Sequence, residues 1–199
     1  MSKPSIEIPP RFILISGPLG AGKNTAADHF AQTEGLLHVS SSDILRDEAR
    51  ERGAEADREG LSAVALELHR EYDTLGALTL LCMERWQAQM DEYSAGLVIS
   101  GIRIVADAQE AKDHQAKLLY VDAPRHIRIQ RILARNRDGD AQVSVEARTE
   151  RDIVEYEGTD DPGAPCLRGI QSLSHVVLQN DRTIPELHSL LDNSPRLTV

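Results

Sequence analysis

The chain has 199 residues, of which 32 are acidic and 22 are basic, so its formal net charge at pH 7 is −10. This length suits one large domain, and the acidic balance argues against nonspecific attraction to nucleic acid or to anionic lipid. No apolar run reaches the roughly 20 residues of a membrane span, and the first ten residues lack a signal-peptide core. We therefore expect a cytoplasmic protein that binds anions through local positive charge.

Short aliphatic and β-branched runs alternate with helical patterns along the chain, which is typical of a parallel sheet flanked by helices. The predicted strands are Arg11–Ser16, Leu36–Ser40, Gly96–Ser100, Lys117–Asp122 and His175–Asn180. Between the second and third strands, residues 43–93 show apolar side chains at helical spacing and are predicted to form a helical insertion. Two further helices are expected after the fourth strand, one starting at Pro124 and one from Ser144 to Tyr156.

The stretch GPLGAGKNT, residues 17–25, follows the first predicted strand and has the spacing of a phosphate-binding loop. Glycines in such a turn let main-chain N–H groups close around phosphate oxygens, and the following helix adds partial positive charge. A lysine at position 23 is then placed to reach the terminal phosphates. The predicted ATP-binding residues of this loop are Gly17, Gly20, Ala21, Gly22, Lys23, Asn24 and Thr25.

Asn24 departs from the usual pattern, because a Ser or Thr that binds a metal ion is expected directly after the lysine. The amide oxygen of Asn24 is a neutral ligand that can reach Mg²⁺ directly or through water, and Thr25 is the other candidate. We expect Mg²⁺ as the cofactor.

The loop and four further blocks, SSDILRDEARERG, LVISGIR, RILARNRDGD and VVLQNDRTIPEL, resemble the P-loop nucleoside monophosphate kinase superfamily. The likeness is to its dephospho-CoA kinase and deoxynucleoside monophosphate kinase members and covers nearly the whole chain. It implies one α/β domain over residues 1–199 with a P-loop NTPase fold and a five-stranded parallel sheet in the order 2-3-1-4-5. It also implies a core of residues 11–42, 94–136 and 159–199, an acceptor-binding insertion at 43–93 and a lid at 137–158.

The resemblance assigns acceptor binding to residues that follow the second and third strands. Asp43 would organise a metal-bound water or accept the proton of the attacking oxygen, although SSSD also suits a helix cap. Arg46 lies one helical turn further and would grip the acceptor's phosphate, unless it is a solvated helix arginine. Arg103 is suited to the same grip, and Arg70 is a weaker candidate.

The same resemblance draws attention to Ser100, because the residue directly before Gly101 is usually an acid in this family. Ser100 can still hold a metal-bound water by hydrogen bonding. With this carboxylate missing, the candidate metal-binding residues are Asn24 and Asp43, and Asp43 takes the larger share.

Donor binding is assigned to arginines after the fourth strand. On a helix, Arg128, Arg131 and Arg135 share one face that is free for anions. The resemblance gives Arg131 a catalytic role, brings Arg135 to the donor, and makes Arg137, Arg148 and Arg151 lid residues. Asn180 resembles the place where adenine is contacted. The alternatives are arginines paired with nearby acids and, at Asn180, a plain turn.

We therefore expect transfer of the ATP γ-phosphoryl group to a small phosphorylated acceptor, with Lys23, Asp43 and Arg131 as catalytic residues. A nucleoside monophosphate is the favoured acceptor, and dephospho-CoA is the nearest alternative. A nucleotide-binding regulatory protein without transfer activity is a second alternative. A polynucleotide kinase is a third, although the acidic composition does not favour it.

Overall fold

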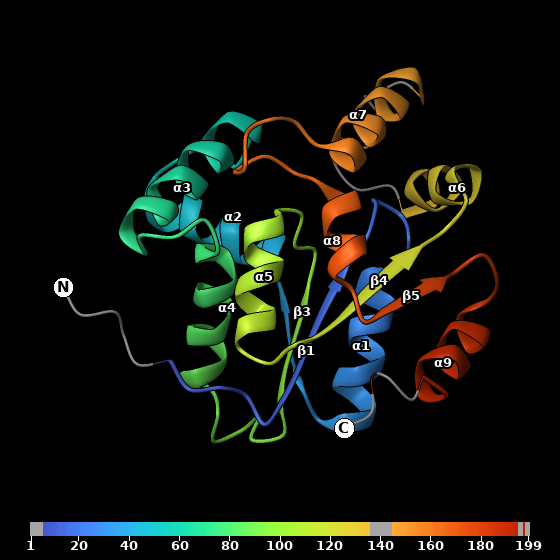
Figure 1. The fold of residues 1–199 in the computed structure, drawn as a ribbon, viewed down its shortest axis with the longest axis horizontal. Coiled ribbons are helices and arrows are strands. Elements are labelled where there is room, and N and C mark those ends of the chain that lie inside the picture. Colours follow the sequence, from blue (N-terminus) through green and yellow to red (C-terminus); the bar gives the residue numbers. More distant parts are fainter. Residues whose placement is uncertain (1–5, 136–144, 195–196, 198–199) are drawn as a thin grey trace.

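The computed structural model describes residues 6–135, 145–194 and 197, which form a five-stranded sheet with every neighbouring pair of strands parallel (Figure 1). The strands are β1 Arg11–Ser16, β2 Leu37–Ser40, β3 Gly96–Ser100, β4 Lys117–Asp122 and β5 Val176–Gln179. Their order in space is β2-β3-β1-β4-β5. The α/β fold class and the sheet order implied by the resemblance are confirmed, and each strand ends within one residue of its predicted bounds.

Helices cover both faces of this sheet. In the described segments they are α1 Lys23–Glu34, α2 Ser41–Glu51, α3 Arg58–Glu71, α4 Ala77–Gln87, α5 Val105–Asp113, α6 Arg125–Arg135, α7 Val145–Glu157, α8 Leu167–Leu173 and α9 Ile184–Asp192. One face carries α4, α5 and α8, and the other carries α1 and α9 (Figure 1). The helices α3 and α7 lie beyond the carboxyl ends of the strands.

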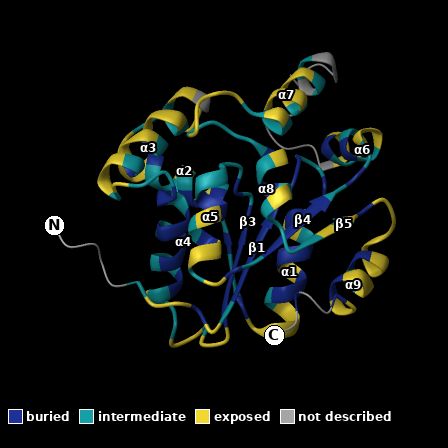
Figure 2. Cartoon of the chain, in the orientation of Figure 1, coloured by how far each residue is buried: buried dark blue, intermediate teal, exposed yellow. Residues whose placement is uncertain are grey.

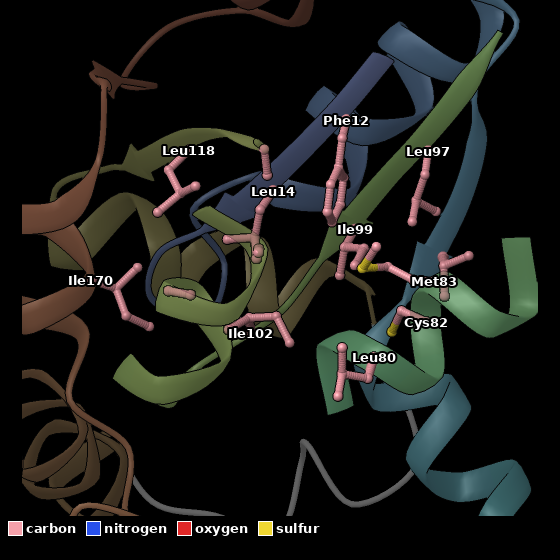
Figure 3. Packing of buried hydrophobic residues seen from close by; sticks show 14 of the residues in the cluster. Phe12, Leu14, Leu80, Cys82, Met83, Leu97, Ile99, Ile102, Leu118 and Ile170 are labelled. Atoms are coloured by element: carbon pink, nitrogen blue, oxygen red, sulfur yellow. The ribbon is translucent and has the colours of Figure 1, made fainter. Parts of the chain in front are cut away.

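The hydrophobic core has two layers because successive side chains of a strand point to opposite faces. On β1, Phe12 and Leu14 face the layer that contains α4, α5 and α8, whereas Ile13 and Ile15 face α1 and α9. The first layer is drawn in Figure 3, and Figure 2 shows the central strands as the most deeply buried part of the chain. Each fully buried aliphatic side chain contributes about 1.5–3 kcal/mol, so these layers fix the sheet edge where the site lies.

The predicted helical insertion at residues 43–93 contains α2, α3 and α4, and α4 packs on the sheet. Cys82, Met83 and Trp86 of α4 are at most 2% exposed and belong to the same core cluster as the strands. Ile44 of α2 joins this core cluster as well, whereas Val64 and Leu68 of α3 belong to a smaller apolar cluster with Ala49 of α2 and Ala77 of α4. Helical periodicity predicted the helices of this segment, but it could not show which of them packs on the sheet.

The segment predicted to be a lid, residues 137–158, is described from residue 145 onward, where it forms α7. This helix agrees within one residue at each end with the helix predicted from Ser144 to Tyr156. None of the helices in the described part of the chain combines the length and the hydropathy that crossing a bilayer requires.

Candidate active site

The loop between β1 and α1 is a tight turn whose glycines take conformations that other residues avoid. Gly17, Gly20 and Gly22 have φ angles of 140°, 79° and 100°. A Cβ atom at Gly22 would collide with Nδ2 of Asn180, and one at Gly20 would lie 2.7 Å from the main-chain oxygen of Arg128. The turn and its close packing against neighbouring segments therefore both require glycine.

Lys23 is the first residue of α1, and Gly22 is the residue that caps this helix. The first N–H groups of a helix lack partners within it and carry partial positive charge, which makes this end a natural anion site. The Lys23 ammonium lies back over the loop and donates a hydrogen bond of 2.9 Å to the main-chain oxygen of Pro18. Sequence and structure thus place one lysine charge and a helix N-terminus at the same turn.

A cavity of about 520 Å³ opens at this turn, within the size range of small-ligand sites. Its lining residues are Leu19, Gly20, Gly22, Lys23, Asn24, Thr25, Ser40, Ser42, Asp43, Arg46, Gly101, Arg103, Arg131, Asn180, Arg182, Ile184 and Leu187. They follow the carboxyl ends of β1, β2, β3 and β5 or come from α2, α6 and α9. Ligands of open parallel sheets bind at this edge, so most of the predicted donor and acceptor residues meet where the fold favours binding.

Asp43 and Arg46 form an ion pair on the first turns of α2 and both line the cavity. Nη1 of Arg46 donates to Oδ1 of Asp43 at 2.7 Å and to the main-chain oxygen of Ser42 at 3.1 Å. The capping position of α2 is Ser40, so the alternative that Asp43 caps this helix is wrong. Asp43 instead faces the cavity as one half of its ion pair with Arg46.

Arg103 lines the same cavity and pairs with an acidic residue of α7. Its Nη1 lies 3.0 Å from both Oε1 and Oε2 of Glu155. A guanidinium in such a pair is equally suited to a phosphate, which offers the same arrangement of charged oxygens. Arg103 also lines a second cavity of about 180 Å³ between α6 and α7, so it lies between the two cavities.

Arg131 on α6 is held at the turn between β5 and α9. It donates to the main-chain oxygens of Asn180 at 3.0 Å and of Arg182 at 3.2 Å. Asn180 in turn donates from Nδ2 to the main-chain oxygen of Ala21 at 2.8 Å. Asn180 is therefore not part of a plain turn, because its side chain ties β5 to the phosphate-binding loop.

Comparison with known proteins identifies the family. Residues 16–147 match the model of a family described as an AAA domain. The chain is 32% identical over 153 residues to the cytidylate kinase of Haloquadratum walsbyi, covering 73% of this chain and 70% of that protein. The chain belongs to the P-loop nucleoside monophosphate kinase superfamily.

Two further comparisons agree with this membership. A UPF0200/UPF0201 protein of Archaeoglobus fulgidus is 34% identical over 135 residues, a match that covers 66% of this chain and 41% of that relative's length. Shikimate kinase from Acinetobacter baumannii, solved in complex with shikimate, superposes with a TM-score of 0.53 at 17% identity and covers 90% of this chain and 89% of its own. At this identity the second comparison supports the fold of the superfamily.

In this P-loop kinase superfamily member, positive charge gathers at the cavity although the chain as a whole is acidic. Among the described residues that line the cavity, Asp43 is the acidic one, and the cationic ones are Lys23, Arg46, Arg103, Arg131 and Arg182. Clustered cations in a cleft raise the local concentration of an anionic ligand. The expectation of local positive charge agrees with this arrangement.

The cavity residues fit a magnesium ion, which prefers oxygen ligands and completes its shell with water and substrate phosphates. Asn24, Thr25 and Asp43 present such oxygens. Within the described residues no group of three or more His, Cys, Asp or Glu side chains could enclose a metal ion. A site that takes one or two protein oxygens and relies on bound phosphate suits this donor set.

Several predicted residues lie elsewhere in this superfamily member. Arg70 is exposed on α3 and is not among the cavity residues, whereas Arg151 on α7 lines the second cavity. Arg128 was expected on a free anion-binding face with Arg131, but it is 7% exposed and pairs with Asp152 at 2.6 Å. Burial with an internal carboxylate removes Arg128 from the candidates. Arg137 and the side chains of Arg135 and Arg148 lie outside the described residues.

Some cavity residues were not singled out from the sequence as ligand-binding. Arg182 is two residues after Asn180, so its nearness to the end of a predicted strand could have drawn attention to it. Leu19, Ile184 and Leu187 add apolar surface, and Ile184 is 59% exposed. A predicted ATP-binding residue, Ala21, is 0% exposed and is not among the residues that line the cavity.

Proposed function

We propose that this protein is an ATP-dependent phosphotransferase that moves the γ-phosphoryl group to a ribo- or deoxynucleoside monophosphate. One observation carries the proposal: a single cavity is lined by the phosphate-binding loop on one side and by Asp43, Arg46 and Arg103 on the other. The similarity to the cytidylate kinase of Haloquadratum walsbyi supports a nucleoside monophosphate as the acceptor.

Donor binding uses the loop and its helix. The main-chain N–H groups of the loop residues that line the cavity, Gly20, Gly22 and Lys23, and the α1 N-terminus hold the phosphates of ATP, and the Lys23 ammonium neutralises charge that grows on the transferred group. Arg131 reaches the same phosphates from α6. Leu19, Ile184 and Leu187 offer apolar surface for the adenine ring. Magnesium, when bound, would neutralise phosphate oxygens, and Asn24 and Asp43 are the residues that would hold it.

Acceptor binding uses the opposite wall. Arg46 and Arg103 grip the acceptor's phosphate and aim one of its oxygens at the γ-phosphorus in line with the leaving group. The new oxygen–phosphorus bond forms as the bond between the γ-phosphorus and the bridging oxygen breaks, and ADP leaves with that oxygen. Asp43 accepts any proton that the attacking oxygen carries. Position and charge therefore supply the rate enhancement.

An ADP-release assay with magnesium and ATP tests the proposal against a panel of ribo- and deoxynucleoside monophosphates and dephospho-CoA, with a reaction lacking any acceptor as background. Turnover with one or a few nucleoside monophosphates is the expected result. Lys23→Ala should lower this turnover by at least about 10²-fold, which excludes a contaminating kinase. Turnover with dephospho-CoA alone would show that dephospho-CoA, and not a nucleoside monophosphate, is the acceptor.

A regulatory protein without transfer activity remains the second candidate, because Asn24 and Ser100 stand at positions where a hydroxyl and an acid are usual in the family. The two functions predict opposite results in the same assay. Tight binding of ATP, measured by calorimetry, together with no ADP release above background for any acceptor would overturn the enzymatic proposal in favour of the regulatory one.

A further inference from the structure

A chain of polar contacts runs behind the cavity from α1 to the end of β3. Oδ1 of Asp28 lies 2.7 Å from Nδ1 of His38, and Nε2 of His38 lies 2.8 Å from Oγ of Ser100. Oγ of Ser100 lies 3.4 Å from Oδ1 of Asn24. Asn24 lines the cavity, whereas Ser100 is 1% exposed and lies behind it. The contacts therefore connect an exposed carboxylate to the first side chain after Lys23.

Hydrogen-bond partners assign the protons in this chain. A carboxylate accepts, so Nδ1 of His38 donates to Asp28, and we assign Nε2 as the acceptor of the Ser100 hydroxyl proton. The hydroxyl of Ser100 has one proton, and the contact of 2.8 Å with His38 takes it in preference to the contact of 3.4 Å with Asn24. Ser100 is thereby left with only lone pairs on the side of Asn24.

The polarity of Ser100 selects the orientation of the Asn24 amide. Two acceptor oxygens facing each other at 3.4 Å repel, and turning the amide by half a rotation places its NH₂ group against Ser100. The amide oxygen is then turned away from Ser100 and can face the cavity that Asn24 lines, where an oxygen ligand serves magnesium. Without His38, the hydroxyl of Ser100 would donate to the amide oxygen and hold it away from the cavity.

We propose that Asp28 and His38 are positioning residues that act through Ser100 to turn the Asn24 amide oxygen toward the magnesium ion of bound ATP. The inference rests on the proposed function for the presence of that ion. It explains how a serine before Gly101 and an asparagine after Lys23 work together. Partners behind a metal ligand typically change metal affinity by about 10- to 100-fold when they are removed.

The test measures the dissociation constant for ATP in EDTA and in excess Mg²⁺. The first constant divided by the second is the magnesium ratio, which is larger when magnesium strengthens ATP binding more. We expect Asp28→Ala to reduce this ratio by about tenfold and to leave the constant in EDTA unchanged. Asp28→Asn keeps an acceptor oxygen for Nδ1 of His38 and should retain most of the ratio. Glu34→Ala is the matched control, because it removes an exposed carboxylate from the same helix that pairs with Arg11.

A double-mutant cycle decides whether Asp28 acts through Ser100. Ser100→Ala should lower the ratio by about as much as Asp28→Ala, and the double variant should lower it no further. An unchanged ratio in Asp28→Ala, or additive losses in the double variant, would overturn the inference. The measurement uses no acceptor, so an absence of phosphoryl transfer would overturn the proposed function and leave this result standing.

Discussion

Asp43 and Asp47 lie on successive turns of α2 and make the same local ion pair, so only their position in the fold distinguishes them. Each accepts a hydrogen bond of 2.7 Å from the arginine three residues later. Asp43 and Arg46 line the cavity, whereas Asp47 and Arg50 are not among its lining residues. Local sequence therefore cannot separate a carboxylate that lines the cavity from one in a surface ion pair, but the distance along α2 from the carboxyl end of β2 does.

Asp43→Asn should lower kcat by about 10²-fold or more, because the amide cannot accept a proton and carries no charge. The dissociation constant for ATP should stay within about twofold, since the loop that binds the donor phosphates is untouched. Asp47→Asn removes an equivalent ion pair from the same helix and should leave kcat unchanged. Steady-state kinetics on both variants checks this, and equal kcat for Asp43→Asn and wild type would refute the role of Asp43.

Gly17 is required both for its positive φ angle and because there is no space for a Cβ atom, and the second requirement can be tested separately. Its φ is 140°, and an added Cβ would collide with the main-chain oxygen of Val121 on β4. Gly53 also has a positive φ, of 70°, but an added Cβ there would meet no atom within 4 Å. The pair thus distinguishes a glycine needed for close packing from one needed only for its backbone angle.

Gly53→Ala should cost about 1–2 kcal/mol of unfolding free energy, the usual penalty of a left-handed conformation. Gly17→Ala should cost at least about 2 kcal/mol more, because β4 cannot yield without disturbing the sheet. Urea unfolding of both variants measures the difference. Equal destabilisation would mean that the loop moves away from β4 at no cost.

At the scale of elements, α7 supplies an ion-pair partner to a cavity residue. Glu155 of α7 accepts hydrogen bonds of 3.0 Å from Arg103, so a phosphate must compete with this carboxylate for the guanidinium. Glu157 on the same helix pairs instead with Arg168 at 2.6 Å, which is not among the lining residues of either cavity. If Arg103 binds the acceptor's phosphate as proposed, that binding is linked to the position of α7.

Glu155→Gln should lower KM for the acceptor by about two- to tenfold, because a neutral amide competes less well with phosphate and the pair is only partly buried. The affinity for ATP should not change. Glu157→Gln provides the control and should leave both values at those of wild type. A higher KM in Glu155→Gln would show instead that Glu155 positions Arg103 for the phosphate.

Strands and helices, which local sequence encodes, could be predicted, whereas contacts between segments far apart in the sequence could not. The strand runs are short, apolar and β-branched, so their bounds followed from the residues alone. The contact between Arg103 and Glu155 joins residues 52 positions apart, and no local pattern encodes it. The same holds for α4, whose place on the sheet depends on which apolar faces meet after folding.

At the scale of the molecule, a chain with a net charge of −10 gathers cavity-lining cations at one edge of a sheet whose interior is apolar. In the core, by contrast, burying a charged group costs free energy. Asp107 on α5 is 1% exposed and accepts a hydrogen bond of 3.1 Å from the main-chain N–H of Thr79, which joins α4 to α5. Burial raises the pKa of Asp107 from 3.8 to about 7.

This raised pKa sets the sign of a stability change with pH. Between pH 3.8 and about 7 the folded state holds a proton on Asp107 that the unfolded state has released. Stability from this group is therefore fully present below the lower value and is lost as the pH rises through the upper one. Asp107→Asn keeps the acceptor oxygen and cannot ionise, so it should abolish this loss.

Urea unfolding at pH 5 and pH 8 tests this for Asp107→Asn and for Asp113→Asn, an exposed residue at the end of the same helix. Relative to wild type, Asp107→Asn should gain roughly 2–3 kcal/mol of unfolding free energy between the two pH values, because about two pH units of titration are removed at about 1.4 kcal/mol each. Asp113→Asn should follow wild type at both. Parallel profiles for wild type and Asp107→Asn would mean that the carboxyl group ionises in the folded state without penalty, so that water reaches the junction between α4 and α5.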